Sequence, residues 1–222
     1  MPLHLNTVSD LLWESLTTLM AIEEFNSFRL VGGTSLSLQL GHRESIDIDL
    51  FTDVEYDSLD FGRLERILKE VFPYVDNSSI GDVVFGRSYF VGNDAHNAFK
   101  LDIYYSNEPF VFPLLEIDNI RLASKEEIAA MKLEVIANGG RKKDFWDIHE
   151  LLDVYTLEQM LGFYEQRNPY GSAREELLER CLDFSLAEDD LTPNCYRNQD
   201  WELMKIDIEE EVQKIMNDFS GF

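Results

Sequence analysis

The 222-residue chain is poor in cysteine, in cationic side chains and in long hydrophobic runs. Its two cysteines, Cys181 and Cys195, have neither CxxC nor zinc-finger spacing, which favours a reduced cytoplasmic protein with buried or idle thiols. No stretch approaches the roughly 18 apolar residues that a membrane span requires, and the first residues lack the basic and apolar regions of a secretory signal. We therefore expect a cytoplasmic protein that has no membrane partner.

Cationic residues are strongly outnumbered, because 19 Lys and Arg stand against 43 Asp and Glu, for a formal net charge of −24. Non-specific binding along nucleic-acid backbone depends on clustered Lys and Arg, so double-stranded DNA is not an expected partner. One locally basic run, residues 141–143, suits a small anion or a single phosphate contact. HExxH, GxSxG and Walker P-loop motifs are also absent from the sequence.

The hydrophobic pattern changes at about residue 122. Before this point, alternating apolar residues predict strands among helices, whereas only helical stripes follow it. We predict an α+β fold: a mixed sheet flanked by helices in residues 1–122, then an all-helical domain in residues 123–222. The expected strands are 28–31, 46–51, 79–92 (a pair or one bent strand), 99–105 and an edge-like strand at 117–122. The expected helices include 7–24, 35–40, one that Asp57 or Ser58 caps, one that Ser124 caps, and later pieces up to residue 218.

The most informative stretch joins a glycine turn to a pair of aspartates. Gly32 and Gly33 precede Thr34 and Ser35, and residues 46–51 then alternate between apolar side chains and the aspartates Asp47 and Asp49. In a strand both carboxylates point the same way, whereas on a helix they would diverge by about 200°. Two converging carboxylates beside bare backbone N–H groups are what a Mg²⁺–triphosphate complex needs.

A third carboxylate is expected from a later strand. Residues 99–105 alternate again, with Lys100 and Asp102 on the parity opposite to the apolar residues. Two Mg²⁺ ions need about three carboxylates to stabilise both the attacking and the leaving oxygens of a phosphoryl transfer. We therefore predict that Asp47, Asp49 and Asp102 hold a two-ion site, and that Asp102 also accepts the proton of the acceptor hydroxyl.

These residues resemble the signature of the nucleotidyltransferase superfamily, in which Gly-Gly opens a helix and Asp-x-Asp lies on the next strand. The patterns Gly-Gly-Thr-x-Leu-Ser and His-Arg-x-Ser-x-Asp-x-Asp-Leu-Phe are similar to one branch, the AbiEii-type nucleotidyltransferases, which are toxins of bacterial toxin–antitoxin and abortive-infection systems. The segments Ser-x-Glu-Glu-Ile-Ala-Ala-Met-Lys-Leu and Arg-x-Lys-Asp-Phe-x-Asp-Ile extend the resemblance, which spans roughly residues 28–152.

The resemblance and the residues together predict the rest of the site. Gly32 and Gly33 let the backbone approach the phosphates at a helix N-terminus, where the hydroxyl of Thr34 or Ser35 adds a contact or serves as an ordinary cap. By resemblance, Lys132 reaches the triphosphate. One of Asp144 and Asp147 positions Lys132 or contacts the nucleotide, with Asp144 the first choice. Two cations, Arg43 and Lys143, are expected to bind the nucleotide, and His42 is expected to hold the turn.

The resulting prediction is a Mg²⁺-dependent nucleotidyltransferase that transfers a nucleoside monophosphate from an NTP to an RNA (tRNA-like) or protein acceptor. By resemblance it is the toxin of a two-gene system with a separately encoded antitoxin. Two alternatives stay open. A small-molecule nucleotidyltransferase that modifies an aminoglycoside suits the charge of −24. An inert nucleotide-binding or partner-binding module of the same fold is disfavoured by the intact acidic residues and Lys132.

Overall fold

A computed structural model describes residues 2–77 and 85–220, with side chains described up to residue 217. The chain divides into two compact units. Unit 1 comprises Met1–Gly41 and Ser45–Ala123, and unit 2 comprises His42–Glu44 and Ser124–Phe222. The segment His42–Glu44 was predicted to be part of the first domain. Its contacts instead group it with unit 2, which contains the helices after residue 123.

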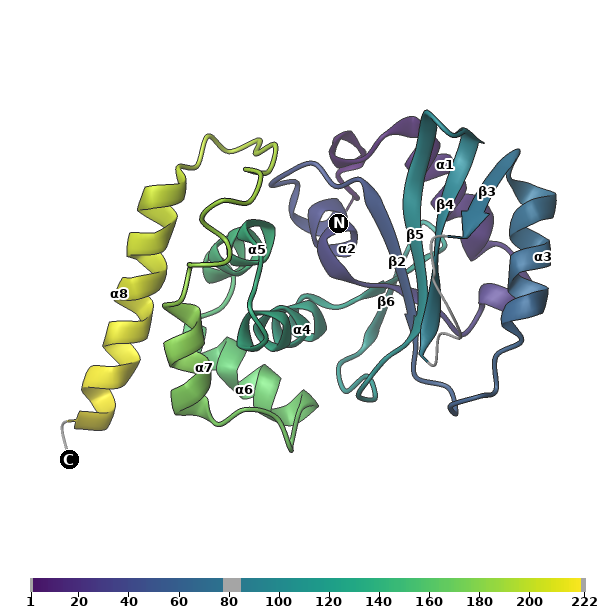
Figure 1. The fold of residues 1–222 in the computed structure, drawn as a ribbon. Helices are drawn as coiled ribbons and strands as arrows, with labels where there is room; N and C mark the ends of the chain where they lie inside the picture. Colours follow the sequence, from purple (N-terminus) through teal and green to yellow (C-terminus); the bar gives the residue numbers. More distant parts are fainter. Residues whose placement is uncertain (1, 78–84, 221–222) are drawn as a thin grey trace. The chain divides into compact units, whose positions relative to one another are not determined.

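Unit 1 is built on a mixed sheet that has seven strands within the described residues, in the order β3-β4-β5-β2-β1-β7-β6. The pairs β2–β5 and β1–β7 are parallel, and the other neighbours are antiparallel. Flanking helices complete the predicted mixed architecture (Figure 1), which is confirmed. The strands are β1 (Arg29–Leu30), β2 (Asp47–Thr52), β3 (Tyr74–Asn77), β4 (Gly86–Asp94), β5 (Asn97–Tyr105), β6 (Leu114–Ile117) and β7 (Ile120–Ala123).

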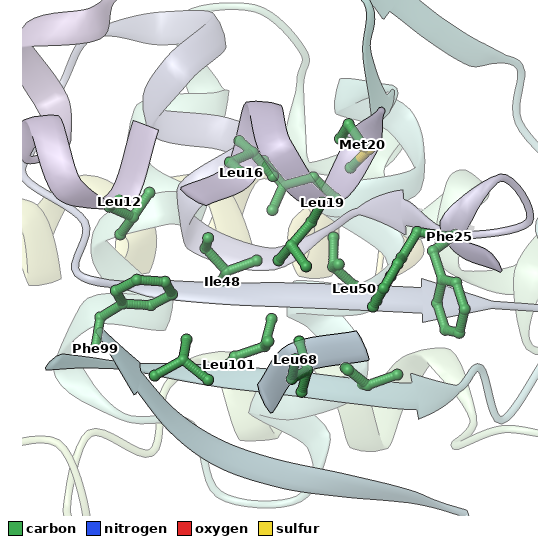
Figure 2. Packing of buried hydrophobic residues seen from close by; sticks show 14 of the residues in the cluster. Leu12, Leu16, Leu19, Met20, Phe25, Ile48, Leu50, Leu68, Phe99 and Leu101 are labelled. Atoms are coloured by element: carbon green, nitrogen blue, oxygen red, sulfur yellow. The ribbon is translucent and has the colours of Figure 1, made fainter. Parts of the chain in front are cut away.

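One face of this sheet carries the hydrophobic core. Leu16 and Leu19 of α1 lie over Ile48 and Leu50 of β2, and Leu101 of β5 lies in the same cluster (Figure 2). Because strand side chains alternate, burying these residues turns the intervening polar residues of β2 and β5 to the opposite face. The helices of unit 1 are α1 (Asp10–Met20), α2 (Gly32–Leu40) and α3 (Phe61–Val71), with short 3₁₀ turns at Leu5–Thr7 and Glu23–Phe25.

Three local predictions in unit 1 need correction. The cap of α3 is Asp60, whose side chain accepts a hydrogen bond from Arg63 N, rather than Asp57 or Ser58. The single strand predicted at 117–122 is a hairpin of β6 and β7, with Asp118 and Asn119 both at positive φ in the turn. The strand predicted at 79–92 begins at Gly86 where it is described, and its residues 79–84 lie outside the described part of the chain.

Unit 2 is helical, as predicted, and its caps explain where its helices begin. Ser124 accepts a hydrogen bond from Glu127 N at the start of α4, and Thr156 and Gln159 form a reciprocal capping box at the start of α6. No described helix is long and apolar enough to cross a membrane. The helices are α4 (Lys125–Ala137), α5 (Lys142–Leu152), α6 (Leu157–Arg167), α7 (Arg174–Cys181) and α8 (Trp201–Ser220).

Candidate active site

The three predicted carboxylates lie on one face of two neighbouring strands. Asp49 of β2 is paired directly with Asp102 of β5 in a parallel register, and Asp47 is paired with Lys100. Adjacent strands lie about 4.8 Å apart. All three aspartates are half-buried and alternate with the buried residues of their strands. The fold therefore gathers acidic groups from segments more than 50 residues apart in sequence.

Lys100 is the immediate electrostatic partner of this acidic row. Its Nζ lies 2.6 Å from Asp102 Oδ2. Burial alone would lower the pKa of Lys100, but the hydrogen bond to Asp102 and the charges of Asp102, Asp49 and Asp47 outweigh it and raise the pKa. The lysine is therefore protonated and offsets part of the repulsion among the carboxylates. Its parity with Asp102 was visible in the sequence, but the ion pair was not predicted.

The acidic row has the donors that Mg²⁺ prefers. Carboxylate oxygens are the usual protein ligands of this hard cation, and Asp102 Oδ1 is buried without a hydrogen-bond partner. Within the described residues, however, no three His, Cys, Asp or Glu side chains are gathered closely enough to enclose a metal ion. The carboxylates of Asp47, Asp49 and Asp102 fit Mg²⁺ chemically, and Asp102 Oδ1 is available as a ligand.

Gly32 stands directly against Asp49. Helix α2 begins at Gly32, which has φ +65°, and a Cβ built on this glycine would lie 2.6 Å from Asp49 Oδ2. Val31 N also donates to Asp49 O at 2.9 Å. The N-cap residue Val31 offers no side-chain cap, so the backbone N–H groups at the start of α2 are not covered by their own cap. The start of α2 therefore combines N–H donors with the positive end of the helix dipole, which is the arrangement that binds anions. This start lies beside Asp49.

Thr34 and Ser35 lie inside α2 rather than at its first position, because the helix starts at Gly32, three residues earlier than predicted. Thr34 Oγ1 lies 2.7 Å from Ser45 Oγ and also donates to Asp47 O. Ser35 Oγ donates to Ala123 O at 3.4 Å. Both residues are buried, and their hydroxyls tie α2 to the sheet and serve no N-cap. Hydroxyl contacts to a nucleotide stay a prediction, and the backbone N–H groups are the better-placed donors.

In unit 2, Asp147 is the centre of a buried ionic cluster. Its Oδ1 accepts hydrogen bonds from Arg43 Nε at 2.7 Å and pairs with His42 Nε2 at 2.9 Å. Its Oδ2 lies 2.8 Å from Arg43 Nη2 and 2.7 Å from Lys132 Nζ. Burial raises the pKa of a carboxyl, but the charges of Arg43 and Lys132 and the hydrogen bonds hold the pKa of Asp147 well below its usual range. Asp147 therefore stays ionised with both oxygens in use.

Lys132 is held between two carboxylates of α5. Its Nζ lies 2.6 Å from Asp144 Oδ1, while Asp144 Oδ2 accepts a hydrogen bond from Arg141 N at 3.0 Å. Burial lowers the pKa of a lysine, but Asp144 and Asp147 reverse this effect and raise the pKa of Lys132 to about 12. Asp144 and Asp147 both position Lys132, which the sequence analysis expected of one of them.

Arg43 is buried and fully engaged, which the sequence did not reveal. Besides its two bonds to Asp147, its Nη1 donates to Glu44 O at 2.9 Å. The segment His42–Glu44 is held further by Tyr196 N, which donates to His42 O at 2.8 Å. Arg43 thus positions its segment, and a direct nucleotide contact by Arg43 or Asp147 stays a prediction. His42 holds the turn through one ring nitrogen, consistent with the structural role expected for it.

Each cation of the basic run 141–143 makes an interaction within the structure, and the Arg141 side chain is 60% exposed. Arg141 makes two bonds to Asp190, at 2.9 and 3.0 Å. Lys142 is buried, and its Nζ donates to Glu188 O at 3.0 Å. Lys143 is half-buried and also makes an interaction within the structure. Its predicted contact with the nucleotide is a proposal.

The mixed sheet, with its acidic row beside a helix that begins at glycine, has the fold of solved nucleotidyltransferases. MenT4, a nucleotidyltransferase toxin of Mycobacterium tuberculosis, has a similar fold: TM-score 0.60, 14% identity, with 89% of this chain and 78% of that chain covered. The antibiotic-resistance factor ANT(2'')-Ia is similar over 71% of this chain and 92% of its own, with TM-score 0.52 and 17% identity.

Sequence comparison then gives the family. A model of the family described as "Nucleotidyl transferase AbiEii toxin, Type IV TA system" matches residues 14–220, so the chain belongs to the AbiEii nucleotidyltransferases. An uncharacterized protein of Aquifex aeolicus is 30% identical over 163 residues, which are 67% of this chain and 71% of that protein. The resemblance inferred from the motifs is confirmed.

Proposed function

We propose that the protein transfers a nucleoside monophosphate from an NTP to a hydroxyl of an RNA or protein acceptor, with Mg²⁺ bound at Asp47, Asp49 and Asp102. The observation that carries this proposal is the direct pairing of Asp49 with Asp102, with the start of α2 packed against Asp49. The proposed metal ligands thus lie beside backbone N–H groups that are proposed to bind phosphate, which supports the proposal. This is the requirement of a metal-assisted transfer from a triphosphate.

In this proposal, unit 1 binds the triphosphate at the start of α2 and accepts the proton at Asp102 of β5. Backbone N–H groups at Gly32 and Gly33 bind the triphosphate at the helix start. The acceptor oxygen forms a bond to the α-phosphorus, and the bond between that phosphorus and pyrophosphate breaks. Asp102 accepts the proton of the acceptor hydroxyl, directly or through a water. When bound, Mg²⁺ supplies positive charge that stabilises the attacking and leaving oxygens.

The residues of unit 2 are proposed to complete the nucleotide site. Residues 1–122 then form the catalytic domain, and residues 123–222 supply Lys132 to the triphosphate. The two short contacts from Asp144 and Asp147 support this role, because they fix the direction of a buried ammonium group that stays charged. Lys143 is proposed to add a further cation at the same site.

We also propose a partner protein and a compartment. Its description as the toxin of a Type IV system supports a separately encoded antitoxin. The two cysteines are both free thiols in the structure, which agrees with a reducing cytoplasm. The acceptor is the least constrained element, because no described basic run is left open for a long nucleic acid.

An aminoglycoside-like acceptor is the second candidate function. The net charge of −24 favours a polycationic substrate, and the fold of ANT(2'')-Ia is similar. An inert binding module is the third, and the retained Asp47, Asp49 and Asp102 weigh against it.

One incubation separates these candidates. The protein is mixed with each α-labelled NTP, Mg²⁺ and either total RNA, lysate protein or tobramycin, and Asp49→Asn serves as the matched variant. Label in RNA or in a protein band from the wild type alone supports the proposal. Label on tobramycin alone supports the second candidate. Binding of NTP with no transfer to any acceptor supports the inert module and contradicts the proposal.

A further inference from the structure

An aromatic pair lies beside the acidic row on the same face of the sheet. Phe51 of β2 is paired directly with Tyr104 of β5, and each lies two residues beyond an aspartate of the row on its own strand. Residues two apart in a strand share a face and lie about 7 Å apart. Both rings are half-buried, and their centroids are 5.9 Å apart with planes inclined at 39°. The two rings form one apolar surface next to the carboxylates.

Two contacts fix the Tyr104 ring: Gly86 lies under one face of the ring, and Ser88 contacts its hydroxyl. A Cβ at its strand partner Gly86 would lie 2.4 Å from Tyr104 Cγ, so the ring lies over a position that has no side chain. The hydroxyl of Tyr104 lies 3.0 Å from Ser88 Oγ. Ser88 is itself the strand partner of Asp102. The orientation of the ring is therefore coupled to the strand position that holds the third carboxylate.

We propose that Phe51 and Tyr104 form a stacking platform for the terminal nucleobase of an RNA acceptor. Successive bases stack on aromatic side chains in proteins that bind single-stranded RNA, with little sequence preference. A base on Tyr104 would leave its own ribose hydroxyl toward Asp102, about 7 Å along the strand. The inference rests on the proposed function, because it assigns the acceptor of that same reaction.

The strand order places the Tyr104 side of the platform away from the start of α2, which favours the acceptor over the NTP as its occupant. The sheet runs β4-β5-β2-β1, and α2 begins directly after β1 and against Asp49 of β2. The phosphate donors are therefore on the β1 side of the row. Tyr104 and Ser88 lie on β5 and β4, on the other side of β2. The acceptor reaches the α-phosphorus from that second side.

The charges of the chain favour stacking over phosphate contacts. With a net charge of −24, the protein repels an RNA backbone. Arg43, Arg141 and Lys142 are each bonded within unit 2. A ring surface attracts a base without requiring positive charge. Ser or Thr side chains of a protein acceptor, and the saturated rings of an aminoglycoside, offer no comparable flat face.

The test measures binding without turnover. A single-stranded oligoribonucleotide ending in 3′-2-aminopurine is titrated with the full chain in the absence of Mg²⁺ and NTP, and stacking quenches its fluorescence. We expect quenching by the wild type and about tenfold or weaker binding by Tyr104→Leu, within the range that loss of one stacking ring causes. Tyr104→Phe keeps the ring and binds within about threefold of wild type. Tyr170→Leu, the same change at a tyrosine that is 96% exposed, is the matched control and leaves binding unchanged.

A second variant and a kinetic readout protect the test from a folding artefact. Phe51→Trp enlarges the platform, and we expect tighter binding at an unchanged melting temperature. In the transfer assay, Tyr104→Leu raises the KM for the oligonucleotide and leaves the KM for NTP unchanged. Equal binding by wild type and Tyr104→Leu, no quenching by the wild type, or an increase in the KM for NTP alone would overturn the platform. Absence of transfer by the wild type to any acceptor would instead overturn the proposed function, whatever the oligonucleotide binding.

Discussion

Gly32 packs so closely against Asp49 that position 32 has no room for a side chain. A Cβ at this position would lie 2.6 Å from Asp49 Oδ2, and the φ of +65° disfavours any L side chain. Because Gly32 has no side chain, the backbone at the start of α2 can lie directly against Asp49. Two requirements, backbone approach and left-handed conformation, select glycine here.

We predict that Gly32→Ala lowers transfer at least tenfold and destabilises the protein by about 1–3 kcal/mol, since it introduces strain and displaces Asp49. The control is Gly162→Ala in α6, where a Cβ meets nothing within 4 Å. That variant is expected to gain up to about 1 kcal/mol in stability, with activity unchanged. Urea unfolding and initial rates measure both. Full activity in Gly32→Ala would show that α2 does not approach the substrate.

The buried cluster around Asp147 makes a stability prediction. Asp147→Asn leaves Arg43 and Lys132 with too little negative charge, and we expect a loss of about 3–5 kcal/mol in the free energy of unfolding. Glu165→Gln removes one partner of the surface pair with Arg174, and it is expected to cost less than about 1 kcal/mol. Urea denaturation of both variants compares them directly. Similar losses would show that the Asp147 cluster is no more important than a surface pair.

The raised pKa of Lys132 predicts that the free energy of unfolding falls at alkaline pH. In the folded chain this pKa is about 12, against 10.5 for a lysine in its ordinary setting. The folded state thus binds the proton more tightly, so the contribution is complete below about pH 10.5 and is lost as the pH rises toward 12. Unfolding free energies at pH 9 to 12 are expected to fall more steeply for wild type than for Lys132→Met. Parallel curves would contradict the ion pairs.

The two thiols should differ sharply in reactivity. Burial raises the pKa of Cys181 to about 12, whereas Cys195 is only half-buried. Because the thiolate is the reactive form, titration with a thiol reagent at pH 8 is expected to modify Cys195 quickly and Cys181 only on unfolding. Mass spectrometry of the modified peptides identifies each site. Rapid modification of Cys181 in the native protein would contradict its packing in α7.

The sequence predicted the two strands that carry Asp47, Asp49 and Asp102, because alternation is a local signal. The parity of Asp47, Asp49 and Asp102 against their apolar neighbours requires only that each segment be a strand with one buried face. The cap at Ser124 was likewise predictable from a few adjacent residues. The positions of the aspartates on one face of the sheet could therefore be predicted.

Long-range pairing was not readable in the same way. Nothing near Arg43 in the sequence shows that it binds Asp147, more than 100 residues away, instead of facing a phosphate. Arg141 pairs with the carboxylate of Asp190, and Lys142 donates to the backbone carbonyl of Glu188. Both partners follow helices α6 and α7 in the sequence. The register that joins Phe51 to Tyr104 also depends on the whole sheet. Such contacts depend on tertiary packing. A single sequence shows each residue with its neighbours in the chain but does not show its distant partner.

Transfer from α- and γ-labelled NTP tests the central claim most directly. The protein is incubated with Mg²⁺ and RNA, and each label is followed in wild type and in Asp49→Asn. The account predicts that α-label enters the acceptor, that γ-label leaves as pyrophosphate, and that Asp49→Asn does neither while remaining folded. Transfer of γ-label to the acceptor, or retention of most α-transfer by Asp49→Asn, would contradict it.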